Sequence, residues 1–275
     1  MKRRLTLAVV LALVAGLGIV AWQAYGYLYA RFTPERCTVA NPAGEPVALT
    51  REQSRMSSII VAASFQAGLP ERAATVALAT AYQESGIRNL DYGDRDSLGL
   101  FQQRPDPRFD WGTAEQIMDP WYSSLRFYEE LVKFKKWEST DINDQAQKVQ
   151  RSGHPQAYRK HVPNATALAA TLRGSQQAAV TCVSFAEPVA NPDPIIEVLK
   201  PVPGVTVRTD GNQLLITADD DAHLWAAVHL ALLNTYEAGV SVVEVGDQRL
   251  ETNGTWRTTE RRVDGAVLTL GPAQK

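Results

Sequence analysis

The stretch that decides the fold is ALATAYQESGIRNLDYGDRDSLGLFQQRP, residues 77–105. Its first part completes an Ala-rich run, residues 71–85, which we predict to be a helix that carries Glu84 near its end. A polar loop with three aspartates follows, and then the apolar segment SLGLFQQ, residues 97–103. Cleavage of a glycosidic bond needs a carboxylic acid that stays protonated near neutral pH. Apolar surroundings and the negative end of a helix dipole both raise the pKa of a carboxyl, so this pattern favours Glu84 as that acid.

These residues also carry a resemblance to a known family. The run ESG at residues 84–86, followed by GLFQ at residues 99–102, resembles the E-S-x…G-L-M-Q signature of the lysozyme-like superfamily. Within that superfamily, the signature resembles lytic transglycosylases and goose-type lysozymes in particular. The run YGDR at residues 92–95 is similar to the W-G-D-R run of the goose-type enzymes. The resemblance implies a mainly helical fold and an enzyme that acts on the glycan strands of peptidoglycan.

The resemblance implies Glu84 as the general acid that protonates the leaving glycosidic oxygen. Inverting hydrolysis also needs a second carboxylate that activates water, and Asp94 matches the goose-type aspartate, with Asp96 as the next candidate. The alternative is that these aspartates cap turns and pair with Arg95. Lytic transglycosylases need no second carboxylate, because their single Glu acts first as acid and then as base. The sequence does not decide between the product of hydrolysis and that of transglycosylation.

Other residues of the same region are candidates for binding the sugar chain. Amides and polar groups able to hydrogen-bond sugars are Asp96, Gln102, Gln103 and Tyr158. Aromatic rings able to stack on sugars are Tyr82, Tyr92, Phe109 and Trp111, and packing in the core is the alternative for each of them. Two features depart from the family: Arg104 stands where a further goose-type aspartate would be, and AQKVQ at residues 146–150 replaces the A-Y-N element.

No cofactor or metal is expected. Asp91, Asp94 and Asp96 lack the loop pattern of an EF-hand calcium site. The four histidines form no zinc signature such as H-E-x-x-H.

The N-terminal residues predict a membrane anchor. Three cations, Lys2, Arg3 and Arg4, precede residues 5–30, which contain no charged side chain. About 20 apolar residues span a bilayer as a helix, and the positive-inside rule puts the N-terminus in the cytoplasm. We therefore expect a single-pass protein of the cell membrane with its bulk outside the cytoplasm; a cleaved signal peptide is the alternative.

The charge of the remaining chain limits the partners. From Arg31 onward, 30 acidic side chains stand against 25 basic ones, a net charge of −5. This balance does not indicate nucleic-acid binding. The expected partners are peptidoglycan strands and the membrane, with a protein partner possible for the C-terminal part.

The two cysteines, Cys37 and Cys182, flank the region that carries the motif. In an oxidising compartment they can pair and tie the start of the domain to its end. Two buried thiols are the alternative.

Taken together, the sequence predicts four regions. Residues 1–30 are the cytoplasmic N-terminus and transmembrane helix, residues 31–186 a mainly α lysozyme-like catalytic domain, residues 187–204 a Pro-rich linker, and residues 205–275 a small α+β domain. The function predicted is cleavage of the β-1,4 bond between N-acetylmuramic acid and N-acetylglucosamine. The alternative is a non-catalytic wall-binding or scaffold protein that keeps the lysozyme-like fold.

Overall fold

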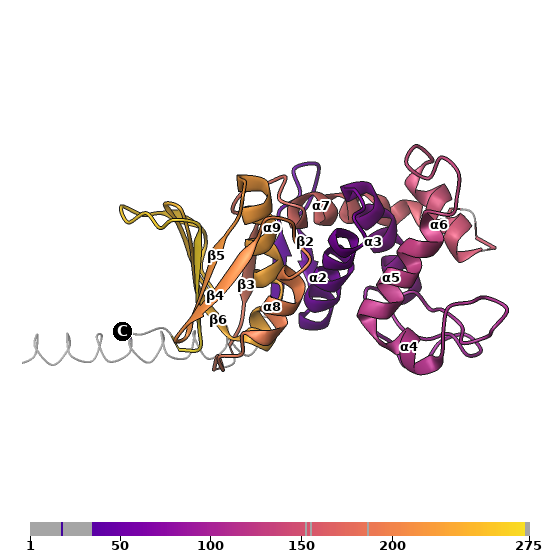
Figure 1. Cartoon of the computed structure of the whole chain (residues 1–275), viewed down its shortest axis with the longest axis horizontal. Helices are drawn as coiled ribbons and strands as arrows, with labels where there is room; N and C mark the ends of the chain where they lie inside the picture. Colours follow the sequence, from indigo (N-terminus) through magenta and orange to yellow (C-terminus); the bar gives the residue numbers. More distant parts are fainter. Residues whose placement is uncertain (1–17, 19–34, 152, 155, 186, 273–275) are drawn as a thin grey trace, which may run out of the picture. The chain divides into compact units, whose positions relative to one another are not determined.

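Helix α3 (Glu71–Ser85), which carries Glu84, is the central helix of this computed structural model and contacts α2, α5, α6 and α7 (Figure 1). The structure describes residues 18, 35–151, 153–154, 156–185 and 187–272. The chain divides into two units, Met1–Glu35 and Arg36–Lys275, and the description that follows concerns the second.

The helices of the described residues are, in chain order, α2 (Arg51–Gln66), α3 (Glu71–Ser85), α4 (Ala114–Met118), α5 (Pro120–Leu131), α6 (Ile142–Gln150), the 3-10 helix η1 (Arg159–His161), α7 (Val162–Leu172), α8 (Asp193–Leu199), α9 (Asp221–Leu232) and α10 (Thr235–Ala238). The strands are β1 (Arg36–Val39), β2 (Val47–Leu49), β3 (Val180–Val183), β4 (Thr206–Asp210), β5 (Gln213–Thr217), β6 (Val240–Val245), β7 (Gln248–Glu251), β8 (Arg257–Thr258) and β9 (Ala266–Leu270).

Local sequence signals set several helix ends. Thr50 and Gln53 form a capping box at the start of α2, and Asp119 accepts backbone hydrogen bonds at the start of α5, with Pro120 in its first turn. Gly86 ends α3 in the left-handed conformation, with φ 67°. Within α3 the buried side chains are mostly small, which lets four neighbouring helices approach closely.

The description of the fold as mainly α is wrong. Helices make up 40% of the described residues and strands 18%, and the strands form two antiparallel sheets, β2-β1-β3 and β4-β5-β9-β6-β7-β8. The smaller sheet joins the two ends of the region predicted to be mainly helical. Its strands have only three or four residues, and β1 pairs with a strand far along the chain, so local periodicity does not reveal them.

The structure also does not support the predicted membrane anchor. Among the residues that the structure describes, no helix is both long and apolar enough to cross a membrane. The most apolar of the long helices, α9, has 12 residues and spans about 18 Å, against about 30 Å for a bilayer core. Apart from Gly18, residues 5–30 lie outside the described residues. The structure therefore does not support the transmembrane helix or the single-pass localisation.

The Pro-rich stretch at residues 187–204 is not extended throughout. It contains α8, whose Ile195, Val198 and Leu199 are buried, and α8 contacts α2 and α9. Pro194 lies in the first turn of α8, where proline is tolerated because no helical hydrogen bond is lost. The division at this stretch into a catalytic and a C-terminal domain stays a prediction.

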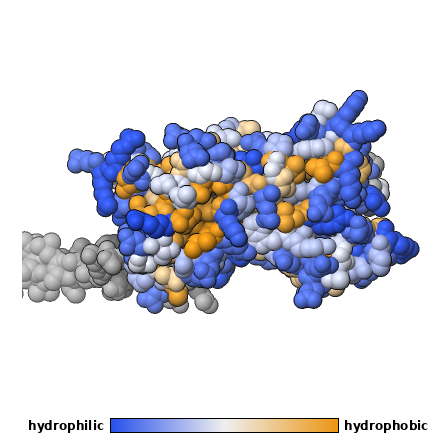
Figure 2. All heavy atoms as spheres, viewed as in Figure 1, coloured by the Kyte–Doolittle hydropathy of each residue, from blue (hydrophilic) through white to orange (hydrophobic). Residues whose placement is uncertain are grey.

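The C-terminal part is joined to the helical part by buried polar contacts. In Figure 1, α8 and α9 lie between the six-stranded sheet and α2. The buried amide of Asn234 donates to Ser58 on α2 and accepts from Arg55. The ring of His229 on α9 bonds to the carbonyl of Thr171 and to the backbone amide of Ala179. On the face shown in Figure 2, apolar side chains gather over the sheet and its adjacent helices.

The predicted disulfide is confirmed. Cys37 on β1 and Cys182 on β3 lie directly opposite each other in the antiparallel register and are joined by a disulfide, 145 residues apart in the sequence. Both side chains are buried. The bond therefore holds together the two strands that begin and end the motif-bearing region.

We predict that Cys37→Ala/Cys182→Ala lowers the free energy of unfolding by roughly 4–5 kcal/mol, because the cross-link restricts a long loop in the unfolded chain. Urea unfolding measures this loss. Adding a reductant to the unmodified protein should reproduce most of it. Equal stability of the oxidised protein and the double variant would contradict the role given to the disulfide.

Candidate active site

The turn after α3 is fixed by hydrogen bonds to the segment at residues 97–103. The hydroxyl of Ser85 donates to the carbonyl of Leu100 at 2.7 Å. Leu98 and Gln103 exchange backbone hydrogen bonds of 2.9 and 3.0 Å, which folds the segment into a tight turn. Gly99 has φ 74°, and a Cβ there would lie 2.7 Å from the carbonyl oxygen of Ile117. The segment is therefore held against the end of the helix that carries Glu84.

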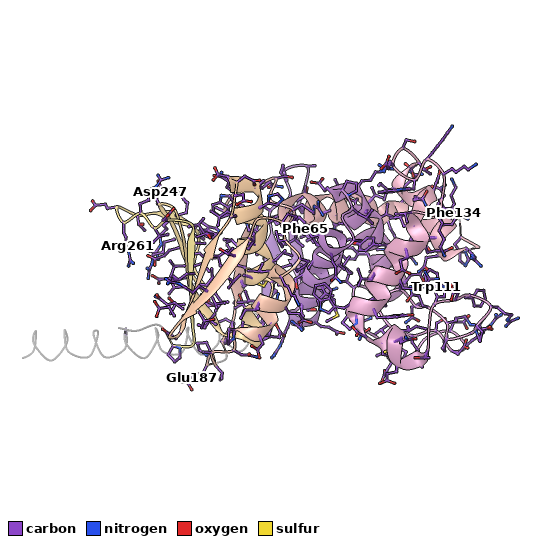
Figure 3. All side chains as sticks on the ribbon, viewed as in Figure 1. Phe65, Trp111, Phe134, Glu187, Asp247 and Arg261 are labelled. Atoms are coloured by element: carbon purple, nitrogen blue, oxygen red, sulfur yellow. A yellow bond between two sulfur atoms is a disulfide. The ribbon has the colours of Figure 1, made fainter. Side chains whose placement is uncertain are left out.

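Glu84 lines a cavity of about 260 Å³ between these elements. The lining comes from the end of α3, the 102–111 stretch and the C-terminal end of α6, and consists of Glu84, Gln102, Gln103, Arg104, Phe109, Trp111, Val149, Gln150 and Arg151. Trp111 is labelled in Figure 3 beside α4 and α5. Pockets for drug-sized ligands have about 300–1,000 Å³, so this cavity can take one part of a longer ligand.

The carboxyl of Glu84 is partly buried and hydrogen-bonded. Burial raises its pKa above the ordinary value of a Glu, while hydrogen bonds from Tyr158 and Gln150 act against this shift and lower the pKa. The hydroxyl of Tyr158 donates to Oε1 of Glu84 at 2.5 Å, and Tyr158 itself is fully buried. Glu84 thus has the environment of a carboxyl that carries a transferable proton at higher pH than an exposed Glu does.

Gln103 brings a buried amide without hydrogen-bond partners to the lining of this cavity. Its side chain is 2% exposed, and neither its Nε2 nor its Oε1 has a hydrogen-bond partner among the described residues. A buried amide without partners costs free energy, so such groups are normally paired. A ligand that offers both a donor and an acceptor, as an acetamido group does, would satisfy it.

The other amides of the site stabilise the loop. Gln102 has φ 47° and donates to the carbonyls of Tyr92 and Gly99. Gln150, on α6, donates to the carbonyl of Phe101 at 2.7 Å. Gln150 therefore connects α6 to the segment that faces Glu84.

Two aromatic side chains form a wall of the cavity. Phe109 has the guanidinium groups of Arg104 and Arg108 over its ring, at 5.4 and 5.9 Å from the centroid. Trp111 is largely buried, and the guanidinium of Arg126 lies over its ring, 5.9 Å from the centroid. Both rings line the cavity, where an aromatic face can stack on a sugar ring.

The sequence-predicted site residues fall into two groups. Glu84, Gln102, Gln103 and Trp111 line the cavity, and Tyr158 contacts Glu84. In contrast, Tyr92, Asp94 and Asp96 lie in the exposed loop at residues 91–96 and do not line it. Asp96 forms an ion pair with Arg104, which lowers the pKa of the Asp96 carboxyl. Tyr82, another stacking candidate, stacks on His161 instead.

Four lining residues were not among the predicted site residues: Arg104, Val149, Gln150 and Arg151. Arg104 was noted only because it replaces a goose-type aspartate. The other three lie at the end of α6, close to the residues that replace the A-Y-N element, so only their position in the sequence pointed to the site. Among the described residues, no group of three or more His, Cys, Asp or Glu side chains could hold a metal ion.

A second cavity, of about 1,000 Å³, lies at one end of the six-stranded sheet, where Asp247 is labelled in Figure 3. It is larger, and five aspartates line it: Asp219, Asp220, Asp221, Asp247 and Asp264. The backbone amide of His223 lowers the pKa of Asp220, which caps α9. We favour the smaller cavity as the active site because it combines an acid of raised pKa with an unpaired buried amide.

Comparison of the chain with protein-family models and with curated proteins gave no significant match in either case. A functional assignment therefore depends on the residues and geometry of the site itself.

We predict that Tyr158→Phe raises the pKa of Glu84, because the hydrogen bond that it removes favours the ionised carboxylate. Carbon-13 NMR titration of the Glu84 carboxyl measures the change. Tyr128→Phe is a matched control: Tyr128 is equally buried, but its hydroxyl donates to the carbonyl of Ile60. A pKa that falls or stays constant in Tyr158→Phe would show that Tyr158 does not hold the carboxylate.

Proposed function

We propose that the chain cleaves peptidoglycan glycan strands at the β-1,4 bond between N-acetylmuramic acid and N-acetylglucosamine, with Glu84 as general acid. The observation that carries this proposal is a partly buried carboxyl of raised pKa in a cavity with two aromatic rings and an unpaired amide. The choice of peptidoglycan comes from the resemblance of residues 77–105 to the lysozyme-like superfamily.

In the first step Glu84 gives its proton to the glycosidic oxygen as the bond from that oxygen to C1 of the muramic acid breaks. Burial raises the pKa of Glu84, which favours the protonated form over that of an exposed Glu. The hydrogen bonds from Tyr158 and Gln150 then stabilise the carboxylate that forms, so the group can give and take back a proton.

The lining of the cavity favours the route with a single carboxylate. Of the described residues that line it, only Glu84 carries a carboxyl group, and Asp94 lies in the exposed loop. Inverting hydrolysis needs a second carboxylate about 6.5–9.5 Å from the first, on the other side of the sugar. In the single-carboxylate route, the carboxylate of Glu84 removes the proton of the muramic acid 6-hydroxyl. That oxygen bonds to C1, which closes an anhydro ring without consuming water.

We predict that Glu84→Gln lowers the rate of peptidoglycan digestion by about 10²–10⁴-fold, because the amide keeps the shape but has no transferable proton. Release of soluble fragments from purified cell walls measures the rate. Asp94→Asn is the companion variant and should lose far less if no base is needed to activate water.

Two outcomes would change the assignment. Equal losses in both variants would favour inverting hydrolysis. Digestion by Glu84→Gln at the unmodified rate, in a preparation free of contaminating lysozyme, would remove Glu84 from catalysis. Binding of cell walls without digestion by the unmodified protein would favour the wall-binding alternative.

A further inference from the structure

The cavity around Glu84 has an unusual charge for a site that binds a neutral sugar. Its charged lining residues are Glu84, Arg104 and Arg151. Burial raises the pKa of the Glu84 carboxyl and so favours its uncharged form, whereas Arg104 and Arg151 bring two guanidinium groups to the lining. Asp96, the ion-pair partner of Arg104, is in the exposed loop and does not line the cavity.

Arg104 is held in place but retains free donors. Its Nε donates to Oδ1 of Asp96, and its guanidinium lies over the ring of Phe109. Among the described residues, its two terminal nitrogens have no hydrogen-bond acceptor, and its side chain is 26% exposed. An arginine fixed through Nε can present both terminal nitrogens to a ligand.

Arg151 lies at the end of α6 on the same cavity. The residue adopts a left-handed conformation, with φ 53°, as the C-cap of the helix. Its one ion pair among the described residues is with Glu130 at 3.5 Å, and Glu130 has a shorter bond, of 2.8 Å, to Lys133. Arg151 is therefore weakly held and can turn towards an anion in the cavity.

We propose that Arg104 and Arg151 together bind a carboxylate of the glycan substrate next to the bond that is cleaved. Guanidinium groups match carboxylates in a planar, two-bond geometry, and neutral sugars offer no such group. The inference rests on the proposed function and deepens it: Arg104 and Arg151 set the preference for strands that bear carboxylates over neutral polymers of N-acetylglucosamine.

The carboxylate has two sources in peptidoglycan. Where a stem peptide is attached, the lactyl carboxyl of muramic acid is consumed in an amide, and the free carboxylates are those of the peptide. Where the peptide has been removed, the lactyl carboxylate itself is free. The two sources share one chemistry and can be separated by the choice of substrate.

The test measures kcat/KM of the full-length protein on three glycans: peptide-bearing strands, strands freed of their peptides, and neutral N-acetylglucosamine oligomers. Arg104→Gln and Arg151→Gln should each lose roughly tenfold on the carboxylate-bearing substrates, as expected for a lost hydrogen bond to a charged group, with little loss on the neutral one. Arg108→Gln is the matched control, because Arg108 contacts the same Phe109 ring but does not line the cavity.

The preferred source follows from which carboxylate-bearing glycan shows the larger loss. Equal losses on charged and neutral glycans would overturn the inference, because the arginines would then only support the loop. If the unmodified protein cleaves none of the three, the proposed function fails, and calorimetric binding to the same glycans decides the inference separately. Tighter binding of the charged glycans that disappears in Arg104→Gln supports it; equal or absent binding overturns it.

Discussion

The carboxyl of Glu84 lies at the C-terminal end of a helix that is buried along most of its length, and the rest of the site depends on this placement. Helix α3 has mainly small side chains on its buried surface, so α2, α5, α6 and α7 can pack close to it. In the last turn of α3, Tyr82, Gln83 and Glu84 are partly buried. Desolvation and the negative end of the helix dipole then act together on Glu84.

Neighbouring elements complete the site around that carboxyl. Ser85 fixes the segment at residues 97–103 against the helix end, and that segment supplies the buried amide of Gln103. Helix α6 supplies Gln150, which bonds to both this segment and Glu84. The disulfide between β1 and β3 holds the two ends of the surrounding region together. Some of these contacts thus act on the carboxyl of Glu84, and the others keep its surroundings in place.

Much of the local structure was predictable because it is encoded over a few residues. The end of α3 followed from the composition of residues 71–85, and the pairing of Cys37 with Cys182 from their positions on either side of the motif-bearing region and an oxidising compartment. The short strands β1 and β3 were missed because each is stabilised by a distant partner. The mainly α description was wrong because it extended a local pattern to the architecture of the chain. The membrane anchor is not supported by any helix of the described residues.

The candidate site shows the same division. Glu84, Gln102 and Gln103 are close in sequence to the motif, and all three line one cavity. Asp94 is equally close in sequence but lies in the exposed loop, because the tight turn at residues 97–103 brings the amides inward and leaves the aspartates outside. Gln150 and Arg151 reach the cavity from another helix, a proximity that arises only from folding.

The proposed mechanism depends most on one carboxyl, that of Glu84, acting as both acid and base. The products of the reaction test this directly. Mass spectrometry of the soluble fragments released from purified peptidoglycan separates two kinds of chain end, which differ in mass by one water. The single-carboxylate mechanism predicts anhydro-muramic acid ends, formed by attack of the substrate's own 6-hydroxyl. Reducing ends with the mass of the added water would contradict it and would require a second carboxylate near Glu84.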